Sequence, residues 1–160
     1  MSIFIVWGHP GEGKTYSVTA WAIDAMKAGR PVFSNYPIIW KGMSSMKWKP
    51  EYAKMPHPPV NAVICIDEAY RYYNSREFKN FSVEEHTYFA TNRHNNLEIY
   101  LIAQNPARLD KVIQEISQFI LCRKIGFLSF ILGFRCYYYE FLEDLSRRRA
   151  GDRESQYRVS

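Results

Sequence analysis

Short continuous apolar runs recur along the chain, and segments with apolar side chains at helical spacing lie between them. Runs of this kind are typical of strands that are covered on both faces of a sheet. They predict strands at Ile3–Trp7, Pro31–Asn35 with Tyr36–Trp40 as an optional extension, Ala62–Glu68, Glu98–Ala103, Phe119–Arg123 and Phe134–Tyr139. The two faces of the resulting sheet must then be covered by other elements.

Helical periodicity fills the gaps between these strands. Apolar residues recur at helical spacing across Thr15–Lys27, and Gly29 follows where a glycine commonly ends a helix. Ser82–Glu85 has the pattern of a capping box and predicts a helix that ends near residues 92–94. A third amphipathic stripe covers Leu109–Ile116. Strands that alternate with helices predict an α/β fold with a parallel sheet and right-handed crossovers.

Three segments lack such a period. Residues 41–60, rich in Lys, Met, Pro and Trp, predict a long irregular loop. The apolar run Ile125–Phe134 has about half of the roughly twenty residues that a membrane-spanning helix needs, so it predicts either a core hairpin or an interfacial anchor. Residues 144–160 are polar and basic, through Arg147–Arg149, and predict a flexible tail after a folded domain of residues 1–143.

The sequence Gly8-His9-Pro10-Gly11-Glu12-Gly13-Lys14-Thr15 stands between the first predicted strand and the first predicted helix. It matches the phosphate-binding loop G-x-x-x-x-G-K-[ST] in the context that this motif requires. Its glycines allow backbone N–H groups to surround phosphates, Lys14 reaches the β- and γ-phosphates, and Thr15 reaches Mg²⁺. The sequence therefore predicts ATP and Mg²⁺ as cofactors. The expected nucleotide contacts are Gly8, His9, Pro10, Gly11, Glu12, Gly13, Lys14, Thr15 and Tyr16.

Polar side chains end two of the other predicted strands. Asp67 and Glu68 follow one apolar run, where a first carboxylate can hold Mg²⁺ through water and a second can orient or deprotonate the attacking water. Asp67 suits the metal and Glu68 the water. Gln104 ends another strand, and the residues alone leave it equally a γ-phosphate sensor or an ordinary polar strand terminus.

Composition narrows the setting of the protein. Hydrophobic residues make up 47% and charged residues 23% of the 160 residues, as in one soluble domain that buries its own core. A net charge of +5 favours an anionic neighbour such as nucleic acid or a membrane surface. Cys65, Cys122 and Cys136 lie far apart within apolar runs, which fits reduced, buried thiols better than disulfides or a zinc site. The N-terminus lacks the pattern of a secretion signal, so the expected location is the cytoplasm.

Three blocks of the sequence together resemble one family. They are the phosphate loop, then Val-Ile-Cys-Ile-Asp-Glu-Ala-Tyr-Arg-Tyr-Tyr-Asn-Ser-Arg-Glu-Phe at 63–78, then Arg-His-Asn-Asn-Leu-Glu-Ile-Tyr-Leu-Ile-Ala-Gln-Asn at 93–105. In order and spacing, over residues 1–125, they look like the zonular occludens toxin family of filamentous-phage assembly ATPases. The resemblance implies a three-layer P-loop NTPase of the RecA-like, additional-strand, catalytic-glutamate type with a mostly parallel central sheet. In that fold the strand before Gln104 lies between the phosphate-loop strand and the Asp67 strand, which makes Gln104 the γ-phosphate sensor.

The resemblance also implies a homo-oligomeric ring at the inner membrane, in which an arginine of the neighbouring subunit completes the site. Arg76 and Arg93 are the candidates, although each could equally pair with a local acid, Glu77 or Glu98. Members of the family commonly carry a transmembrane helix and an extracytoplasmic domain after the ATPase domain, and this sequence predicts neither. The alternatives are a truncated or minimal member, docking on a membrane-embedded assembly partner, or peripheral contact through Ile125–Phe134.

The first function that these features predict is an ATP-hydrolysing motor for virion assembly and extrusion, which moves phage DNA or coat protein. The alternative is a genome-packaging ATPase that threads DNA into a capsid and grips it with Arg147–Arg149 and the loop Lys41–Lys54. A small-molecule kinase shares the phosphate loop, but the sequence has no arginine-rich lid pattern. A nonhydrolysing interaction module would use Tyr70, Tyr72 and Tyr73 as a docking face, although these rings equally suit core packing.

Overall fold

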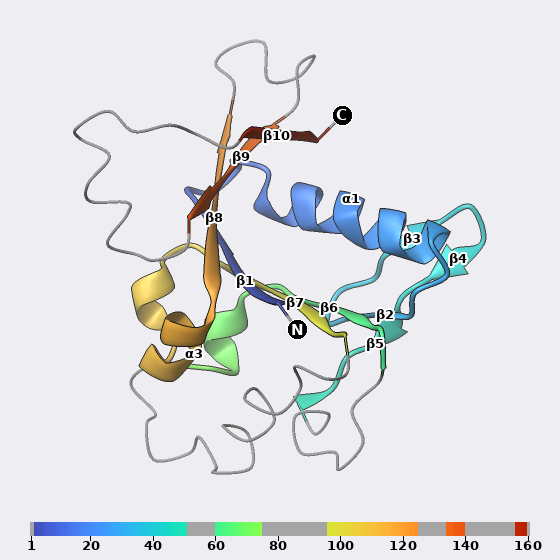
Figure 1. Ribbon diagram of the computed structural model, residues 1–160, viewed down its shortest axis with the longest axis horizontal. Coiled ribbons are helices and arrows are strands. Elements are labelled where there is room, and N and C mark those ends of the chain that lie inside the picture. Colours follow the sequence, from blue (N-terminus) through green and yellow to red (C-terminus); the bar gives the residue numbers. More distant parts are fainter. Residues whose placement is uncertain (1, 51–59, 75–95, 125–133, 140–155, 160) are drawn as a thin grey trace.

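The computed structural model describes residues 2–50, 60–74, 96–124, 134–139 and 156–159 (Figure 1). Within these ranges the helices are α1 (Lys14–Lys27) and α3 (Lys111–Ile116), with short 3₁₀ turns η2 (Ala69–Arg71) and η4 (Pro106–Arg108). The strands are β1 (Ser2–Trp7), β2 (Val32–Ser34), β3 (Ile39–Trp40), β4 (Met43–Ser44), β5 (Met46–Lys47), β6 (Val63–Ile66), β7 (Glu98–Ala103), β8 (Gln118–Lys124), β9 (Phe134–Tyr139) and β10 (Gln156–Val159). The helix predicted from Ser82 onward lies outside the described residues.

The described strands form an eight-stranded sheet in the order β10-β9-β8-β1-β7-β6-β2-β5, and β3 pairs separately with β4. From β8 to β5 neighbouring strands are parallel, whereas β9 is antiparallel to both β8 and β10. β7 lies between β1 and β6, as the resemblance to the additional-strand type implies. The predicted α/β fold with a mostly parallel central sheet is confirmed.

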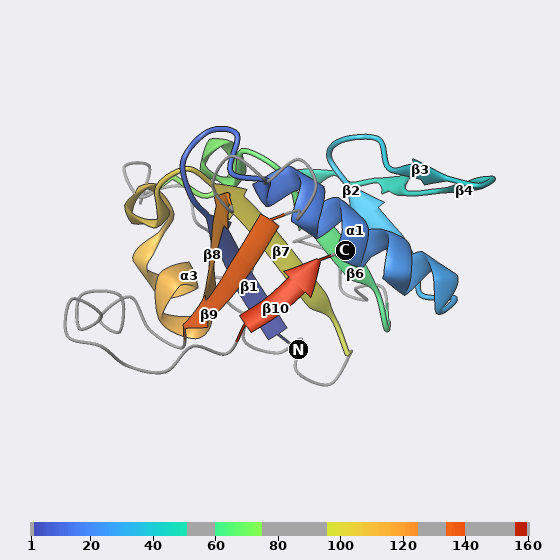
Figure 2. The same cartoon turned by 90° about the horizontal axis from the view of Figure 1, so that it is seen from above.

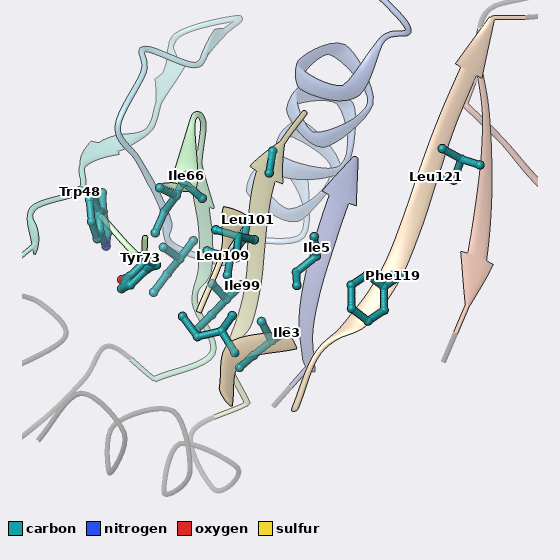
Figure 3. Packing of buried hydrophobic residues seen from close by; sticks show 14 residues of the cluster. Ile3, Ile5, Trp48, Ile66, Tyr73, Ile99, Leu101, Leu109, Phe119 and Leu121 are labelled. Carbon is teal, nitrogen blue, oxygen red and sulfur yellow. The ribbon is translucent and has the colours of Figure 1, made fainter. Parts of the chain in front are cut away.

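Alternate side chains of the central strands pack on opposite faces of the sheet, because successive residues of a strand point in opposite directions. One face carries a cluster that includes residues of η2 and α3, and the other carries a cluster against α1. Figure 3 shows side chains of β1, β6, β7 and β8 pointing away from α1 into the first cluster. Figure 2, seen from above, shows α1 and α3 on opposite sides of the sheet, which gives the three layers expected.

Helix α1 covers its face of the sheet with small and apolar side chains. Val18, Ala22, Ala25 and Met26 are buried on that side. Small alanines let the helix axis approach the strands closely, so the start of α1 is held firmly over the sheet. Gly29 adopts a φ of +76°, and its N–H donates to the carbonyl of Met26 at 3.0 Å, so the helix ends at the glycine that the sequence indicated.

The prediction of an irregular loop at residues 41–60 was wrong for the first part of that range. β4 and β5 lie there, and β5 pairs with β2 at the sheet edge, where the buried Trp48 donates its backbone N–H to Ser34 at 2.8 Å. The optional extension of β2 through Tyr36–Trp40 is also absent, because Ile39–Trp40 pairs with β4 instead. Strands of two residues are too short to show a period of two. Residues 51–59 lie outside the described ranges.

The described C-terminal residues continue the sheet. β9 has the predicted bounds and is antiparallel to β8, so the chain reverses direction between them. Gln156–Val159, within the segment predicted as a tail, form β10 against β9. The apolar residues 125–133 lie outside the described ranges, as do residues 140–155. No helix of the described residues is both long and apolar enough to cross a membrane.

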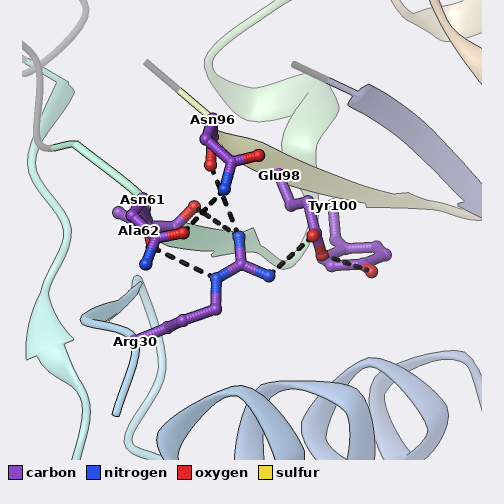
Figure 4. A network of polar contacts seen from close by, with 6 residues as sticks. All are labelled: Arg30, Asn61, Ala62, Asn96, Glu98 and Tyr100. Atoms are coloured by element: carbon purple, nitrogen blue, oxygen red, sulfur yellow. Dashed lines mark hydrogen bonds and ion pairs between the residues drawn. The ribbon is translucent and has the colours of Figure 1, made fainter. Parts of the chain in front are cut away.

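A polar network fastens the end of α1 to the amino ends of β6 and β7 (Figure 4). The guanidinium of Arg30 donates to a Glu98 carboxylate oxygen at 2.6 Å and to the backbone oxygen of Asn61 at 3.1 Å. Glu98 also accepts a hydrogen bond from the hydroxyl of Tyr100 at 3.2 Å. This end of the sheet is therefore closed by side-chain contacts, whereas the opposite, carboxyl end carries the phosphate loop.

Candidate nucleotide site

The phosphate loop joins β1 to α1, and its glycines have conformations that the motif needs. Gly13 precedes the helix with a φ of +80°, which an L side chain rarely adopts. A Cβ on Gly8 would lie 2.6 Å from the backbone oxygen of Cys122 on β8. The loop is therefore pressed against the neighbouring strand, and a larger residue at Gly8 would push it outward.

Lys14 folds back over this loop. Its ammonium donates to the carbonyl oxygens of Gly8 and His9, at 2.8 Å each, and its side chain is buried. Hydrogen bonds to a charged group are stronger than neutral ones, so they hold the loop closed around the lysine. A phosphate group offers the same ammonium a charged partner in place of two neutral carbonyls. The ammonium thus lies where a phosphate-binding lysine is expected.

Glu12 stabilises the loop from the other side. Its carboxylate accepts a hydrogen bond from the backbone N–H of His9 at 2.6 Å. His9, Pro10 and Gly11 are exposed, so the mouth of the loop is open to solvent. Lys124, the last residue of β8, brings its ammonium 3.6 Å from the position of an added Cβ on Gly11. Lys124 was not among the residues predicted for the site, although its position at the end of a strand beside β1 could have indicated it.

Thr15 and Asp67 meet across the start of α1 and the end of β6. The hydroxyl of Thr15 donates to Oδ2 of Asp67 at 3.0 Å, although 52 positions separate the two residues in the sequence. The other carboxylate oxygen, Oδ1, accepts the backbone N–H of Glu68 at 2.8 Å. Both side chains are partly exposed, so they can take new ligands.

A hydroxyl beside a carboxylate is the donor set that suits Mg²⁺, which keeps several waters and needs few protein ligands. The described residues contain no group of three or more His, Cys, Asp or Glu side chains that could hold a metal by themselves. A site for a metal that arrives with phosphates fits this arrangement better than a site for a metal held by protein alone. Thr15 and Asp67 are the residues that would hold it.

Asn35, which the sequence analysis did not assign to the site, holds Asp67 in place. Its side-chain amide donates to the backbone oxygen of Asp67, and its side-chain oxygen accepts the backbone N–H of Asp67, both at 2.8 Å. The position of Asn35 immediately after β2, at the same edge of the sheet as Asp67, was the signal that could have found it.

Glu68 adopts a left-handed backbone conformation, with a φ of +52° and a ψ of 43°. For a residue other than glycine this costs of order 1–3 kcal/mol and is most often found at functional sites. The turn reverses the chain directly after β6, so Glu68 is held at the carboxyl edge of the sheet beside Asp67.

Gln104 follows β7, the strand between β1 and β6. The last residues of β1 and β7, Trp7 and Ala103, are paired, so Gln104 leaves the sheet beside Gly8. It is exposed there. The topology thus brings Gln104 to the same edge of the sheet as the phosphate loop and the two carboxylates.

Three predicted residues remain, of which the structure describes one. Tyr16 is 54% exposed on the first turn of α1, next to the loop. Arg76 and Arg93 lie outside the described residues. Another arginine, Arg108, lies in η4 shortly after Gln104, and its guanidinium is 5.4 Å from the ring centroid of Tyr70.

The chain is similar in structure to proteins of known structure. No curated protein matches it. Its structure is similar to the crystal structure of the N-terminal domain of zonular occludens toxin from Neisseria meningitidis, with 20% identity, a TM-score of 0.68, and 99% of this chain and 94% of that chain covered. It is also similar to the genome-packaging NTPase of Sulfolobus turreted icosahedral virus 2 in complex with ATP-gammaS, with 13% identity, a TM-score of 0.59, and 89% and 93% covered.

The same packaging NTPase in complex with sulfate gives 16% identity and a TM-score of 0.58, with 99% of this chain and 92% of that chain covered. At these identities the structural similarity establishes the P-loop fold. The family follows from the sequence, because the model of the zonular occludens toxin (Zot) family matches residues 38–145, more than half of the chain. The resemblance carried by the three sequence blocks is thereby confirmed, and the chain belongs to the Zot family.

Proposed function

We propose that this protein is an ATPase that drives virion assembly and extrusion of a filamentous-phage-like virus, moving phage DNA or coat protein at the inner membrane of the host. The observation that carries the proposal is the contact between Thr15 and Asp67 beside the buried Lys14. Membership of the Zot family and the similarity to viral packaging NTPases support the motor function.

In the proposed site each residue has a separate task. The ammonium of Lys14 exchanges its two carbonyl partners for the β- and γ-phosphate oxygens of ATP. Backbone N–H groups of the loop bind the same phosphates at the N-terminus of α1, where the helix dipole favours negative charge. Thr15 and Asp67 would hold Mg²⁺ that is bound with the nucleotide, and the metal would neutralise phosphate charge.

Glu68 orients the attacking water and accepts its proton, because the turn after β6 holds this residue at the edge of the sheet that carries the phosphate loop. Gln104 contacts the γ-phosphate and, after hydrolysis, loses that contact. Gln104 lies between β7 and η4, so the change in contact can reach the segment that follows. In phosphoryl transfer such positioning and electrostatic stabilisation supply most of the catalysis.

The test is steady-state ATP hydrolysis by the purified chain over a range of protein concentrations. Glu68→Gln keeps the size and backbone of the residue but removes the base, so we expect ATP to bind while turnover falls by about 10²-fold or more. Lys14→Ala removes the charge that binds phosphates, so we expect both binding and turnover to be lost. A ring with shared sites predicts specific activity that rises with protein concentration.

The outcomes separate the parts of the proposal. Hydrolysis by Glu68→Gln near the wild-type rate would contradict the role of Glu68. Nucleotide binding by Lys14→Ala with unchanged affinity would contradict the site itself. A specific activity that is independent of concentration would contradict an arginine supplied by a neighbouring subunit, for which Arg76 and Arg93 remain the candidates.

Genome packaging is the second candidate function, and the similarity to the packaging NTPase favours it specifically. A packaging motor grips DNA through charged contacts, so its DNA affinity falls steeply as salt is raised. Stimulation of hydrolysis by DNA, lost at high salt, would favour packaging or DNA transport. Stimulation by coat protein alone would favour extrusion.

A further inference from the structure

Two of the three cysteines are neighbours in the sheet, although the sequence places them far apart. Cys122 on β8 and Cys136 on β9 are directly paired in the antiparallel ladder, and their sulfur atoms lie 3.3 Å apart. Both are fully buried. Directly paired residues on antiparallel strands have Cα atoms about 4.5–5.5 Å apart, which lies within the range that a disulfide bridges.

Each of the two cysteines has a contact at the phosphate loop or at the start of α1. The thiol of Cys136 donates to the hydroxyl of Ser17, in the first turn of α1, at 3.5 Å. The backbone oxygen of Cys122 packs so closely on Gly8 that an added Cβ there would lie 2.6 Å away. Gly8 in turn supplies one of the carbonyls that hold Lys14. Displacement of Cys122 would therefore move Gly8 of the phosphate loop, and displacement of Cys136 would move Ser17, two residues after Thr15 in α1.

From this geometry we propose that Cys122 and Cys136 are a reversible oxidation site whose disulfide weakens nucleotide binding at the phosphate loop. The effect on affinity rests on the proposed nucleotide binding, whereas the disulfide itself does not. A disulfide has an S–S length of about 2.05 Å, so oxidation draws the two sulfur atoms together by about 1 Å. It also removes the S–H that Cys136 donates to Ser17.

The oxidant is a peroxide, which is small enough to reach buried thiols when the strands near the sheet edge open locally. The Cys136 thiolate attacks one peroxide oxygen, which gives a sulfenic acid and releases hydroxide. The Cys122 sulfur then attacks the sulfenic sulfur, the S–S bond forms, and hydroxide leaves as water with the thiol proton. In total two thiols give up two electrons and two protons, and hydrogen peroxide becomes two waters.

The order of attack follows from the local hydrogen bonds. The hydrogen bond with Cys122 lowers the pKa of Cys136, more than burial raises it. The same hydrogen bond and burial raise the pKa of Cys122. Cys136 is therefore the thiol that becomes a thiolate first, and the thiolate is the reactive form.

The experiment treats the full chain with hydrogen peroxide, maps disulfides by mass spectrometry after alkylation of free thiols, and titrates a fluorescent ATP analogue. We expect a Cys122–Cys136 cross-link, reversed by dithiothreitol. The Kd for the analogue should rise about tenfold, the size expected when about one hydrogen bond between the loop and the phosphates is lost. By linkage, bound nucleotide should shift the thiol–disulfide equilibrium toward the reduced form, because the oxidised form binds it less well.

Cys65→Ser is the matched control, because Cys65 is also buried on the α1 face but is not one of the paired thiols. It should respond to peroxide as the wild type does, whereas Cys136→Ser should keep its affinity after treatment. The peptide map and its reversal on the wild type need no variant, so a folding defect in Cys136→Ser leaves the test intact.

The proposal is overturned if the wild type forms no such cross-link, or if the cross-linked protein binds the analogue as tightly as the reduced protein. An equal loss of affinity in Cys136→Ser would also overturn it, by placing the sensitive group elsewhere. Failure of the reduced protein to bind the analogue would contradict the proposed function. Cross-linking is measured without nucleotide, so the two failures are distinguishable.

Discussion

Asn35 shows how a residue outside the motifs can fix the position of Asp67, the carboxylate that we propose would hold Mg²⁺. It holds both backbone polar groups of Asp67 from its position immediately after β2, the strand beside β6 in the sheet. Asp67 then meets Thr15 with its own side chain. The carboxylate is therefore placed by contacts from two sides, neither of which depends on the nucleotide.

Replacing Asn35 by alanine should affect both stability and catalysis. The loss leaves two partly buried backbone groups without their protein partner, at a cost of about 1–3 kcal/mol in the free energy of unfolding. We expect kcat to fall more than nucleotide affinity, because Lys14 and the loop remain in place. Urea unfolding and steady-state hydrolysis measure the two effects.

Asn96→Ala is the matched control for this change. The Asn96 side chain donates to that of Asn61 at 2.7 Å, but it is exposed and lies at the opposite end of the sheet. It should leave kcat unchanged. If Asn35→Ala and Asn96→Ala lowered kcat equally, the positioning role of Asn35 would be wrong.

At the residue scale, the sequence predicted the site to the extent that the motif names its own members. Lys14, Thr15 and Asp67 come together as the phosphate-loop pattern and the strand-end carboxylate indicated. The contacts of Asn35 and of the cysteine pair were not predicted, because they depend on which strands are neighbours and in what register. No pattern in the sequence predicts the register of β8 against β9, so the pairing of Cys122 with Cys136 could not be predicted.

At the scale of elements, the predicted strands were found wherever an apolar run was long enough. β7 and β9 have the predicted bounds, and β1 differs by one residue at its start. The short strands β3, β4 and β5 were missed, because two residues cannot show a period. Trp48 is buried at that edge. Its burial was not predicted, because an isolated tryptophan in a proline-rich segment shows no period.

The Arg30 network tests how firmly α1 is joined to the sheet. Arg30 and Glu98 are only 18% and 34% exposed, so removing the guanidinium leaves a half-buried carboxylate without its charged partner. We expect Arg30→Ala to lower the free energy of unfolding by about 1–3 kcal/mol. The network lies away from the phosphate loop, so nucleotide affinity should not change. Urea denaturation and nucleotide titration provide the measurements.

Lys27→Ala provides the comparison within the same part of the molecule. Lys27 pairs with Asp24 at 2.8 Å, but their side chains are 53% and 70% exposed. Exposed pairs of this kind contribute less than about 1 kcal/mol. Equal losses of stability in Lys27→Ala and Arg30→Ala would contradict the view that the buried network joins the helix to the sheet.

At the scale of the whole molecule, buried acidic groups limit stability at high pH. Burial, with a smaller contribution from the charge of Glu98, raises the pKa of Cys65 to about 12 from an ordinary value of 9.0. Burial and the charge of Cys65 likewise raise the pKa of Tyr36. Both groups lie in or against the α1-side cluster.

The direction of the pH effect follows from proton binding. Above pH 9.0 the unfolded chain releases the Cys65 proton while the folded chain keeps it until about pH 12. The unfolded state then binds fewer protons, so stability is full below that window and falls as pH rises through it, by at most about 1.4 kcal/mol per pH unit for one group. Urea unfolding across this range should show the decline, and Cys65→Ala should reduce its slope. An unchanged slope in the variant would assign the decline to other groups.

The position of β1 in the sheet has a consequence for synthesis on the ribosome. β1 carries the phosphate loop and emerges well before its two neighbours, β7 and β8, which begin at Glu98 and Gln118. Pairings between segments so distant in sequence form slowly, because a long loop must close before they contribute. The phosphate loop therefore lacks the two strands that flank β1 until β7 and β8 have been translated. Nucleotide binding by nascent chains should accordingly begin only after β8 has left the exit tunnel.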